Sequence, residues 1–228
     1  MAHDEISAIG ERYARRVNND IYSMLRSEVN LDHQERFSAI AKLLRTRCPK
    51  APEEISLVDL GCGNGGNLLD FIRLGFEPKN LIGLELLEHR VERAMALLPS
   101  SVEIIAGDAS VAPIADASQD IVFQSVVFSS LLSDDFQHQV ANSMWRWLRP
   151  GGAVLWYDFI YDNPRNADVR GVPLTRVRQL FPEGQIFAQR ITLAPPIARR
   201  IAGFGEMFHR FLNLTPLLRT HIIAWIEK

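Results

Sequence analysis

Cysteine is scarce in this chain of 228 residues, which contains Cys48 and Cys62 and no others. Two cysteines exclude a disulfide framework and a cysteine cluster for a metal. No apolar run approaches the roughly 20 residues that a membrane-spanning helix needs. The first residues also lack the basic start and the apolar stretch of a signal peptide. These absences predict a cytoplasmic protein without a membrane span.

A large excess of one charge is missing as well. The formal net charge is -2 at pH 7, so no general attraction to nucleic acid is expected. Hydrophobic residues make up 47% of the chain and charged residues 23%, which is the balance of a globular domain. Basic residues outnumber acidic ones within 151–228 but not within 1–150. Such an excess either meets an anionic substrate or forms ordinary solvated surface.

The first fifty residues have the spacing of helices. Apolar residues recur at intervals of three and four within 21–29 and again within 37–44. Asp32, with Glu35 three residues later, is predicted to be the N-cap of the second of these helices. We therefore expect residues 1–54 to form a helical cap.

From Ile55 onward, short apolar runs alternate with helical stretches, which predicts a parallel sheet with helices on both faces. The predicted strands are Ile55–Leu60, Leu81–Leu84, Val102–Ile105, Asp120–Val127 and Ala153–Tyr157. Two later strands, Gln185–Leu193 and His221–Glu227, are separated by an apolar insert at 194–216. No helix long enough for a parallel crossover is apparent between them, so we expect an antiparallel pair.

A glycine-rich turn follows the first predicted strand, in the segment Val58–Gly66. Glycine lets the backbone turn sharply and approach a ligand without an intervening side chain. Glu85, at the end of the second strand, is placed to accept hydrogen bonds from both hydroxyls of a ribose. Asp108 and the amide of Ala109, after the third strand, can read an adenine edge. Because parallel strands end at one edge of a sheet, these groups predict a nucleotide-type site there.

These motifs resemble those of class I S-adenosylmethionine-dependent methyltransferases of the small-molecule type. The matching segments are Asp59–Gly65, Gly83–Glu85, Gly107–Ala109 and Leu148–Gly152. The resemblance implies one domain over 1–228 with a Rossmann-like, doubly wound α/β fold. Its seven-stranded sheet would be mostly parallel with an antiparallel C-terminal strand, helices on both faces and an N-terminal helical lid. The cofactor-binding core would span 55–160, and the substrate side 161–228.

The resemblance also implies the cofactor, S-adenosylmethionine, the product S-adenosylhomocysteine, and no metal. On the methionine side, Asp59 would help to hold the amino end, and Gln124 and Ser125 would line the site. The glycine loop would pass beside the methionine and the ribose through Gly61, Cys62, Gly63 and Gly65. For Gln124, the alternative is that it only satisfies buried backbone.

On the adenosine side, the resemblance implies that Glu85 binds the ribose hydroxyls and that Leu86 packs on the adenine. Asp108 would accept a hydrogen bond from the adenine amino group, and the amide of Ala109 would donate one to the ring. The alternative for Asp108 is that it caps a turn.

Two residues are candidate general bases for an acceptor hydroxyl. Asp158 follows the fifth strand, where the alternative is that it caps the next loop. His209 lies in the apolar insert, where packing in the core is the alternative. Many small-molecule members of the family have a histidine pair after the fourth strand, and this chain has Phe128–Leu131 there instead.

Four residues are candidate contacts to the acceptor. Tyr13 would belong to the lid, and Phe208 would wall an apolar pocket. Arg165 and Arg199 would bind an anionic group, because a guanidinium can donate to two oxygens at once. Ordinary surface or packing roles are the alternatives for all four.

The expected function is in-line transfer of a methyl group to a small-molecule or glycan acceptor, anionic or apolar, at oxygen. The sequence indicates no nucleic-acid partner and determines no oligomeric state. One alternative is an NAD(P)-dependent oxidoreductase that uses the same glycine loop. Asp59 and the segment Gly107–Ala109 argue against it. Another alternative is a non-catalytic, methyltransferase-like binding module, against which the intact loop and carboxylates argue.

Overall fold

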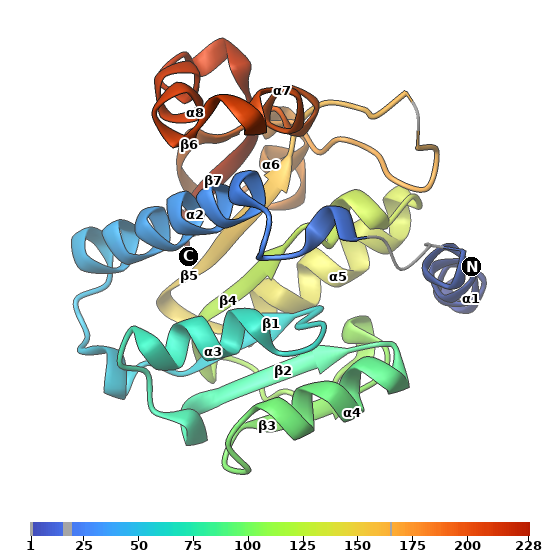
Figure 1. Ribbon diagram of the computed structural model, residues 1–228. Coiled ribbons are helices and arrows are strands. Elements are labelled where there is room, and N and C mark those ends of the chain that lie inside the picture. The colour runs from blue at the N-terminus through green and yellow to red at the C-terminus, as the bar shows by residue number, and fades with distance from the viewer. Residues whose placement is uncertain (1, 16–19, 165) are drawn as a thin grey trace.

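A seven-stranded sheet forms the centre of the computed structural model, which describes residues 2–15, 20–164 and 166–228 (Figure 1). The strands lie in the order β3-β2-β1-β4-β5-β7-β6. Their bounds are β1 Leu57–Leu60, β2 Leu81–Glu85, β3 Glu103–Ala106, β4 Gln119–Ser125, β5 Leu148–Phe159, β6 Gln185–Leu193 and β7 Arg219–Glu227. The first five run parallel, and β7 pairs antiparallel with both β5 and β6. The predicted fold class is confirmed.

Helices cover both faces of the sheet. The helices are α1 Ala2–Ala14, α2 Ser27–Arg47, α3 Gly66–Arg73, α4 Glu88–Leu97, α5 Asp134–Trp147, α6 Leu174–Leu180, α7 Pro195–Ile201 and α8 Glu206–Asn213. One buried cluster joins the sheet to α2, α3 and α4, and a second joins its other face to α5 and α6. Successive residues of a strand point to opposite faces, so Tyr157 belongs to the first cluster and Trp156 to the second.

The last two strands distinguish this sheet from that of a nicotinamide dinucleotide-binding fold. Such folds have the strand order 3-2-1-4-5-6 in a mostly parallel sheet. Here β7 inserts between β5 and β6, with Phe159 opposite His221 and Leu193 opposite Arg219. The insert between β6 and β7 folds into α7 and α8, which lie together at one end of the molecule (Figure 1). The topology therefore favours the methyltransferase fold over the oxidoreductase alternative.

The start of α2 differs from the prediction. Asp32 lies inside α2, which begins at Ser27 after Arg26, so the prediction of Asp32 as an N-cap is wrong. Glu28 stands in the first turn, where a negative charge favours the helix N-terminus, and it accepts a hydrogen bond from Arg26 at 2.8 Å. The contact between Arg26 and Glu28 supports a helix start at Ser27, before the start predicted at Asp32. Before it, Leu25 is 97% exposed, so the helical spacing within 21–29 does not mark one buried helix face.

Within the described parts of the chain, every helix is too short or too polar to pass through a lipid bilayer.

Candidate functional site

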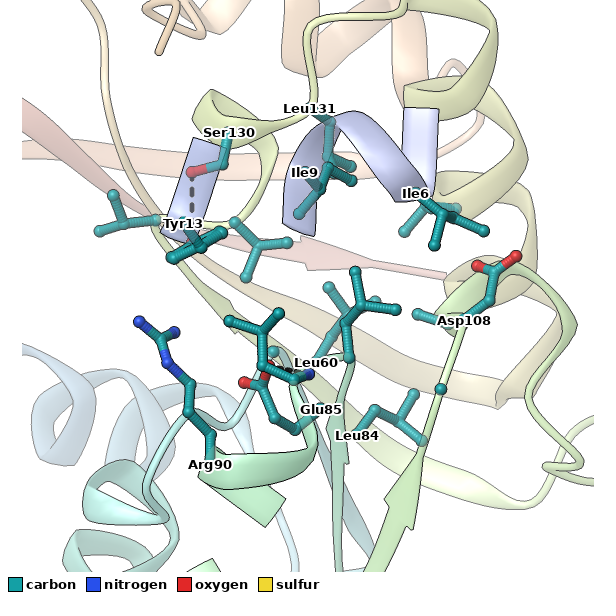
Figure 2. Close-up of a pocket in the computed structure, with 18 of the residues that line it drawn as sticks. Ile6, Ile9, Tyr13, Leu60, Leu84, Glu85, Arg90, Asp108, Ser130 and Leu131 are labelled. Carbon is teal, nitrogen blue, oxygen red and sulfur yellow. Dashed lines mark hydrogen bonds between the residues drawn. The ribbon is translucent and has the colours of Figure 1, made fainter. Parts of the chain in front are cut away.

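A cavity of about 310 Å³ opens at the carboxyl ends of β1, β2 and β4. Six of the residues predicted to bind a cofactor line it. They are Gly61, Glu85, Leu86, Asp108, Ala109 and Ser125. Figure 2 shows Ile6, Ile9 and Tyr13 of α1 on one side of this first cavity, with Glu85 on the other. The structure thus brings together residues from five separate segments of the chain.

The glycine loop lies in a backbone conformation that other residues rarely adopt. Gly61 has a φ of +70° and Gly65 a φ of +86°, both in the left-handed region. A Cβ atom on Gly61 would lie 2.6 Å from Cγ2 of Val127, which also lines the cavity. The other three predicted loop residues, Cys62, Gly63 and Gly65, do not line it. The Cys62 side chain is buried in the cluster beneath α3. The loop needs glycine for its conformation and for the close approach of the chain to the cavity.

Glu85 ties the glycine loop to the start of α4. Its carboxylate accepts hydrogen bonds from the amides of Gly63 and Leu87, each at 2.9 Å. Each carboxylate oxygen can accept a second hydrogen bond, so the side chain still has acceptor capacity toward the cavity. This arrangement holds the carboxylate in one orientation, which suits recognition of two neighbouring hydroxyls.

Asp108 and Gln124, both predicted to bind the cofactor, also have the structural roles that were named as alternatives to cofactor binding. Asp108 caps a short helical turn by accepting hydrogen bonds from the amide and hydroxyl of Ser110, both at 2.8 Å. Gln124 is fully buried behind the cavity, where it donates to the carbonyl of Tyr157 and accepts from the amide of Val127. Gln124 therefore holds the cavity wall in place.

Helix α1 is fixed over the first cavity by polar contacts. Arg12 donates to Glu5 at 2.6 Å and to the carbonyl of Ser130 at 3.1 Å. The hydroxyls of Tyr13 and Ser130 are 3.5 Å apart, and the guanidinium of Arg90 lies 4.5 Å from the centre of the Tyr13 ring. The predicted lid residue Tyr13 thus lines the cavity from above.

Asp59 is a buried acid near the methionine side of the predicted site. Its side chain is fully buried and does not line the first cavity. Its carboxyl oxygens make no close hydrogen bond among the described residues, although the Asn67 side chain is near enough to act on the carboxylate as a donor. Burial raises the pKa of Asp59 to about 8, against the opposing effects of Asn67 and Arg36. A buried acid without a partner costs free energy unless a ligand or water satisfies it. An ammonium group is a ligand that would do so.

Arg36 of α2 lies beside Asp59 in the fold. Its guanidinium donates to the Ser125 hydroxyl and to the Asn67 side chain, both at 3.2 Å. It also lies 5.2 Å from the centre of the Tyr157 ring. No motif in the sequence marks Arg36, because its contacts with Ser125 and Asn67 depend on how α2 packs on the sheet.

The buried acids give a testable dependence of stability on pH. Burial raises the pKa of Asp59 to about 8 and that of Asp158 to about 7, above the unfolded values near 3.9. The native state then binds more protons than the unfolded state. Each group therefore stabilises the native state fully below pH 4, and this stabilisation is lost as the pH rises to the pKa of the group in the folded protein. Between pH 5.5 and 8.5 the free energy of unfolding should fall, by at most about 1.4 kcal/mol per pH unit per group. Asp59→Asn should flatten this fall in denaturant titrations. If the free energy of unfolding of Asp59→Asn fell with pH in parallel with that of the wild type, the role of Asp59 would be contradicted. Asp135→Asn, at an exposed site, is the control.

A second cavity, of about 270 Å³, lies on the α2 side of the sheet. It is lined by Ile21, Tyr22, Met24, Glu28, Val29, Asp32, His33, Arg36, Tyr157, Pro195, Ala198 and Arg199. Tyr22 lines both cavities. Arg36 lines the second and bonds to Ser125, which lines the first. The two cavities are therefore neighbours, and the predicted substrate residue Arg199 belongs to the second.

Three other predicted residues line neither cavity. Asp158 is fully buried and accepts hydrogen bonds from the amides of Ser129 and Phe159, at 3.1 and 2.9 Å. His209 is buried, with Nε2 3.6 Å from Oδ1 of Asp32. Phe208 is partly exposed and packs on Phe204 with ring centres 5.7 Å apart. Arg165, also predicted to contact the acceptor, lies outside the described residues.

Comparison with known proteins gives the family of the central segment. Residues 58–156 match the sequence model of the methyltransferase domain family. A malonyl-[acyl-carrier protein] O-methyltransferase from Hahella chejuensis is 32% identical over 118 residues, or 51% of this chain and 39% of that protein. A dTDP-4-amino-2,3,4,6-tetradeoxy-D-glucose N,N-dimethyltransferase from Saccharopolyspora spinosa is 29% identical over 136 residues, or 60% and 52%. This chain thus spans between two fifths and about half of these relatives.

The fold also matches a solved structure over nearly the whole chain. The geranyl diphosphate C-methyltransferase from Streptomyces coelicolor A3(2), solved with Mg²⁺, geranyl diphosphate and S-adenosyl-L-homocysteine, matches with a TM-score of 0.65. The match covers 98% of this chain and 97% of that one at 14% sequence identity, so it shows the fold alone. The activities named for these proteins include methylation at oxygen, nitrogen and carbon, so their names leave the methylated atom open.

Proposed function

We propose that this chain, which carries a class I S-adenosylmethionine-dependent methyltransferase domain, transfers the methyl group of that cofactor to an oxygen of a small-molecule or glycan acceptor. The observation that carries the proposal is the first cavity, where Glu85, Asp108 and Ser125 meet beside the buried acid Asp59. A nucleotide-type edge with a buried acid beside it is suited to a ligand that has both an adenosine and an ammonium group.

The roles of the cofactor-site residues follow from their chemistry. Bound S-adenosylmethionine supplies a methyl group that its positively charged sulfur has already activated. Glu85 binds the ribose hydroxyls, and Asp108 with the amide of Ala109 binds the adenine. Asp59 binds the ammonium group, and Arg36 binds the carboxylate of the methionine part. Alignment by such contacts can supply roughly 7–11 kcal/mol of barrier lowering, so the main task of the protein is positioning.

Helix α1 excludes water from the reaction. Ile6, Ile9 and Tyr13 present apolar surface to the first cavity, and the contacts of Arg12 hold the helix there. A closed, dry site strengthens electrostatic contacts and protects the activated methyl group from hydrolysis. The acceptor reaches the site from the second cavity, where Arg199 binds its anionic group. The sugar-nucleotide substrate in the name of one relative is an acceptor of this anionic, glycan-like kind.

The role of Arg36 predicts a selective loss of affinity. Arg36→Ala should weaken S-adenosylhomocysteine binding by about tenfold to a hundredfold, because a hydrogen bond to a charged group contributes roughly 1.5–3 kcal/mol. Binding of 5′-methylthioadenosine, which lacks the amino-acid part, should change less than about twofold. Calorimetry on both ligands checks this. Arg45→Ala, at an exposed site on the same helix, is the control. An equal loss for both ligands would refute the assignment.

The test of the proposed reaction is transfer of label from methyl-labelled S-adenosylmethionine into a cell extract separated into small metabolites, glycans, lipids, RNA and protein. We expect label in the small-metabolite or glycan fraction, above the level of a Glu85→Ala variant. Label in RNA or protein alone would overturn the acceptor class. No label in any fraction would favour a binding module that keeps the fold without the reaction.

A further inference from the structure

We propose that the second cavity binds the acceptor and that the carboxylate of Asp32 takes the proton of the acceptor hydroxyl, while Arg199 pairs with an anionic group of the same molecule. This proposal rests on the proposed function and deepens it, since it names the proton acceptor and the substrate class: a small hydroxylated anion. Asp32 comes from α2 and Arg199 from α7, and both line this cavity.

The second cavity adjoins the methionine end of the cofactor site. Tyr157 of β5 lines it, and Tyr157 is the register partner of Ser125 in β4, which lines the first cavity. Arg36 spans the two, since it lines the second cavity and donates to Ser125. An acceptor in the second cavity is therefore next to the part of the cofactor that carries the methyl group.

Most charged side chains of the second cavity already have partners. Glu28 pairs with Arg26 at 2.8 Å, and His33 pairs with Asp70 at 2.6 Å. Arg36 is held by Ser125 and Asn67, as described above. These residues shape the cavity and satisfy one another. Glu28 and His33 are thereby engaged within the protein, and the remaining donors of Arg36 serve the carboxylate of the cofactor.

Asp32 and Arg199 keep more capacity for a ligand, although Nε2 of His209 lies 3.6 Å from Oδ1 of Asp32. Oδ1 of Asp32 is buried without a hydrogen-bond partner among the described residues. Arg199 is exposed, and within the described chain no hydrogen bond or ion pair engages it, although its charge acts on Asp32 and Glu28. One acceptor of protons and one free guanidinium at the same cavity match a ligand with a hydroxyl and an anionic group.

The size of the cavity limits the acceptor. Its volume of about 270 Å³ lies just below the range of roughly 300–1,000 Å³ that is usual for drug-sized ligands. A small acceptor, such as a single anionic sugar unit, fits this volume, whereas an RNA or protein chain would not be enclosed. The apolar side chains Met207 and Phe211 of the insert are exposed and line neither cavity, so they give no apolar wall to this site.

The groups around Asp32 suit it to proton transfer near neutral pH. Burial, Glu35 and Glu28 raise the pKa of Asp32 to about 7, while Arg36 and Arg199 oppose the rise. Tyr157 from β5 and His209 from α8 also face it, and His33 of α2 lines the same cavity. Burial lowers the pKa of His209, so its imidazole is neutral at pH 7. A base whose pKa is near the working pH is the most effective.

The step balances as a simple displacement. The hydroxyl oxygen of the acceptor forms a bond to the methyl carbon, and the bond from that carbon to sulfur breaks with its electron pair left on sulfur. The hydroxyl proton passes to the Asp32 carboxylate. His209, whose Nε2 lies 3.6 Å from Oδ1 of Asp32, packs beside the carboxylate without a hydrogen bond to it.

The test uses the metabolite or glycan fraction that the wild-type protein labels. Asp32→Asn should lower the labelling rate about a hundredfold, the range expected for loss of a general base, and leave S-adenosylhomocysteine affinity within about twofold. The wild-type rate should rise with pH around a midpoint near 7, because Asp32 must lose its proton to act. Asp32→Asn should lose this rise. Asp135→Asn is the matched control at an exposed aspartate.

One further variant tests the role of Arg199. Arg199 is exposed, so Arg199→Ala does not put folding at risk. This variant should need about ten times more of the acceptor fraction to reach half of its maximal rate. The maximal rate itself should not change. Wild-type rates for both Asp32→Asn and Arg199→Ala would overturn the proposal while leaving the methyltransferase function standing. A wild-type protein that fails to bind S-adenosylhomocysteine would overturn the proposed function itself.

Discussion

Replacing Glu85 with alanine is expected to weaken S-adenosylhomocysteine binding by at least about a hundredfold. The carboxylate accepts hydrogen bonds from two ribose hydroxyls in the proposed complex, and hydrogen bonds to a charged group contribute roughly 1.5–3 kcal/mol each. It also holds the amides of Gly63 and Leu87, so its loss frees the glycine loop and the start of α4. The measurement is calorimetry with S-adenosylhomocysteine.

Two controls separate the ribose contact from the structural contacts of Glu85. Glu85→Gln keeps the size of the side chain and one acceptor oxygen, so its loss of affinity should lie between those of wild type and Glu85→Ala. Glu88→Ala removes an exposed acid three residues later and should leave affinity unchanged. Wild-type affinity in a folded Glu85→Ala variant would contradict the assignment of the ribose site.

Gly61→Ala is expected to abolish detectable cofactor binding. The left-handed conformation costs a residue with a Cβ roughly 1–2 kcal/mol, and the new atom would lie 2.6 Å from Cγ2 of Val127. Val127 lines the first cavity, so relieving this contact moves the cavity wall. A fall in the free energy of unfolding of at least about 1 kcal/mol should accompany the loss of binding.

The matched control for Gly61→Ala is Gly203→Ala. A Cβ atom on Gly203 would have no neighbour within 4 Å, and Gly203 has no left-handed φ and lies outside both cavities. Its substitution should change neither stability nor binding appreciably. If Gly61→Ala bound S-adenosylhomocysteine with wild-type affinity, the proposal that this loop closely approaches the cofactor would be contradicted.

The sheet was predictable because its order follows from local patterns. Buried parallel strands are short and almost wholly apolar, and the helices between them force right-handed parallel crossovers. The missing crossover helix before His221 indicated the antiparallel end. The start of α2 was not predictable from spacing alone, since the pair Arg26 and Glu28 competes with the capping pattern of Asp32 and Glu35.

The two cavities differ in how much of them the sequence could predict. The residues of the first follow strand ends directly, so their position along the chain places them at one edge of the sheet. The second joins α2, β5 and α7, and no local motif connects Asp32, Tyr157 and Arg199. Asp158 was expected at the ligand edge, but alternation along β5 turns it to the opposite face from Tyr157, where it holds the amide of Ser129.

The most direct test of the cofactor assignment is a calorimetric titration of the wild-type protein with S-adenosylhomocysteine and, separately, with NADH. We expect one molecule of S-adenosylhomocysteine to bind per chain and no binding of NADH. Binding of NADH without binding of S-adenosylhomocysteine would contradict the assignment of Asp59, Glu85 and Asp108 to a methyl donor, and would favour an oxidoreductase that uses the same glycine loop.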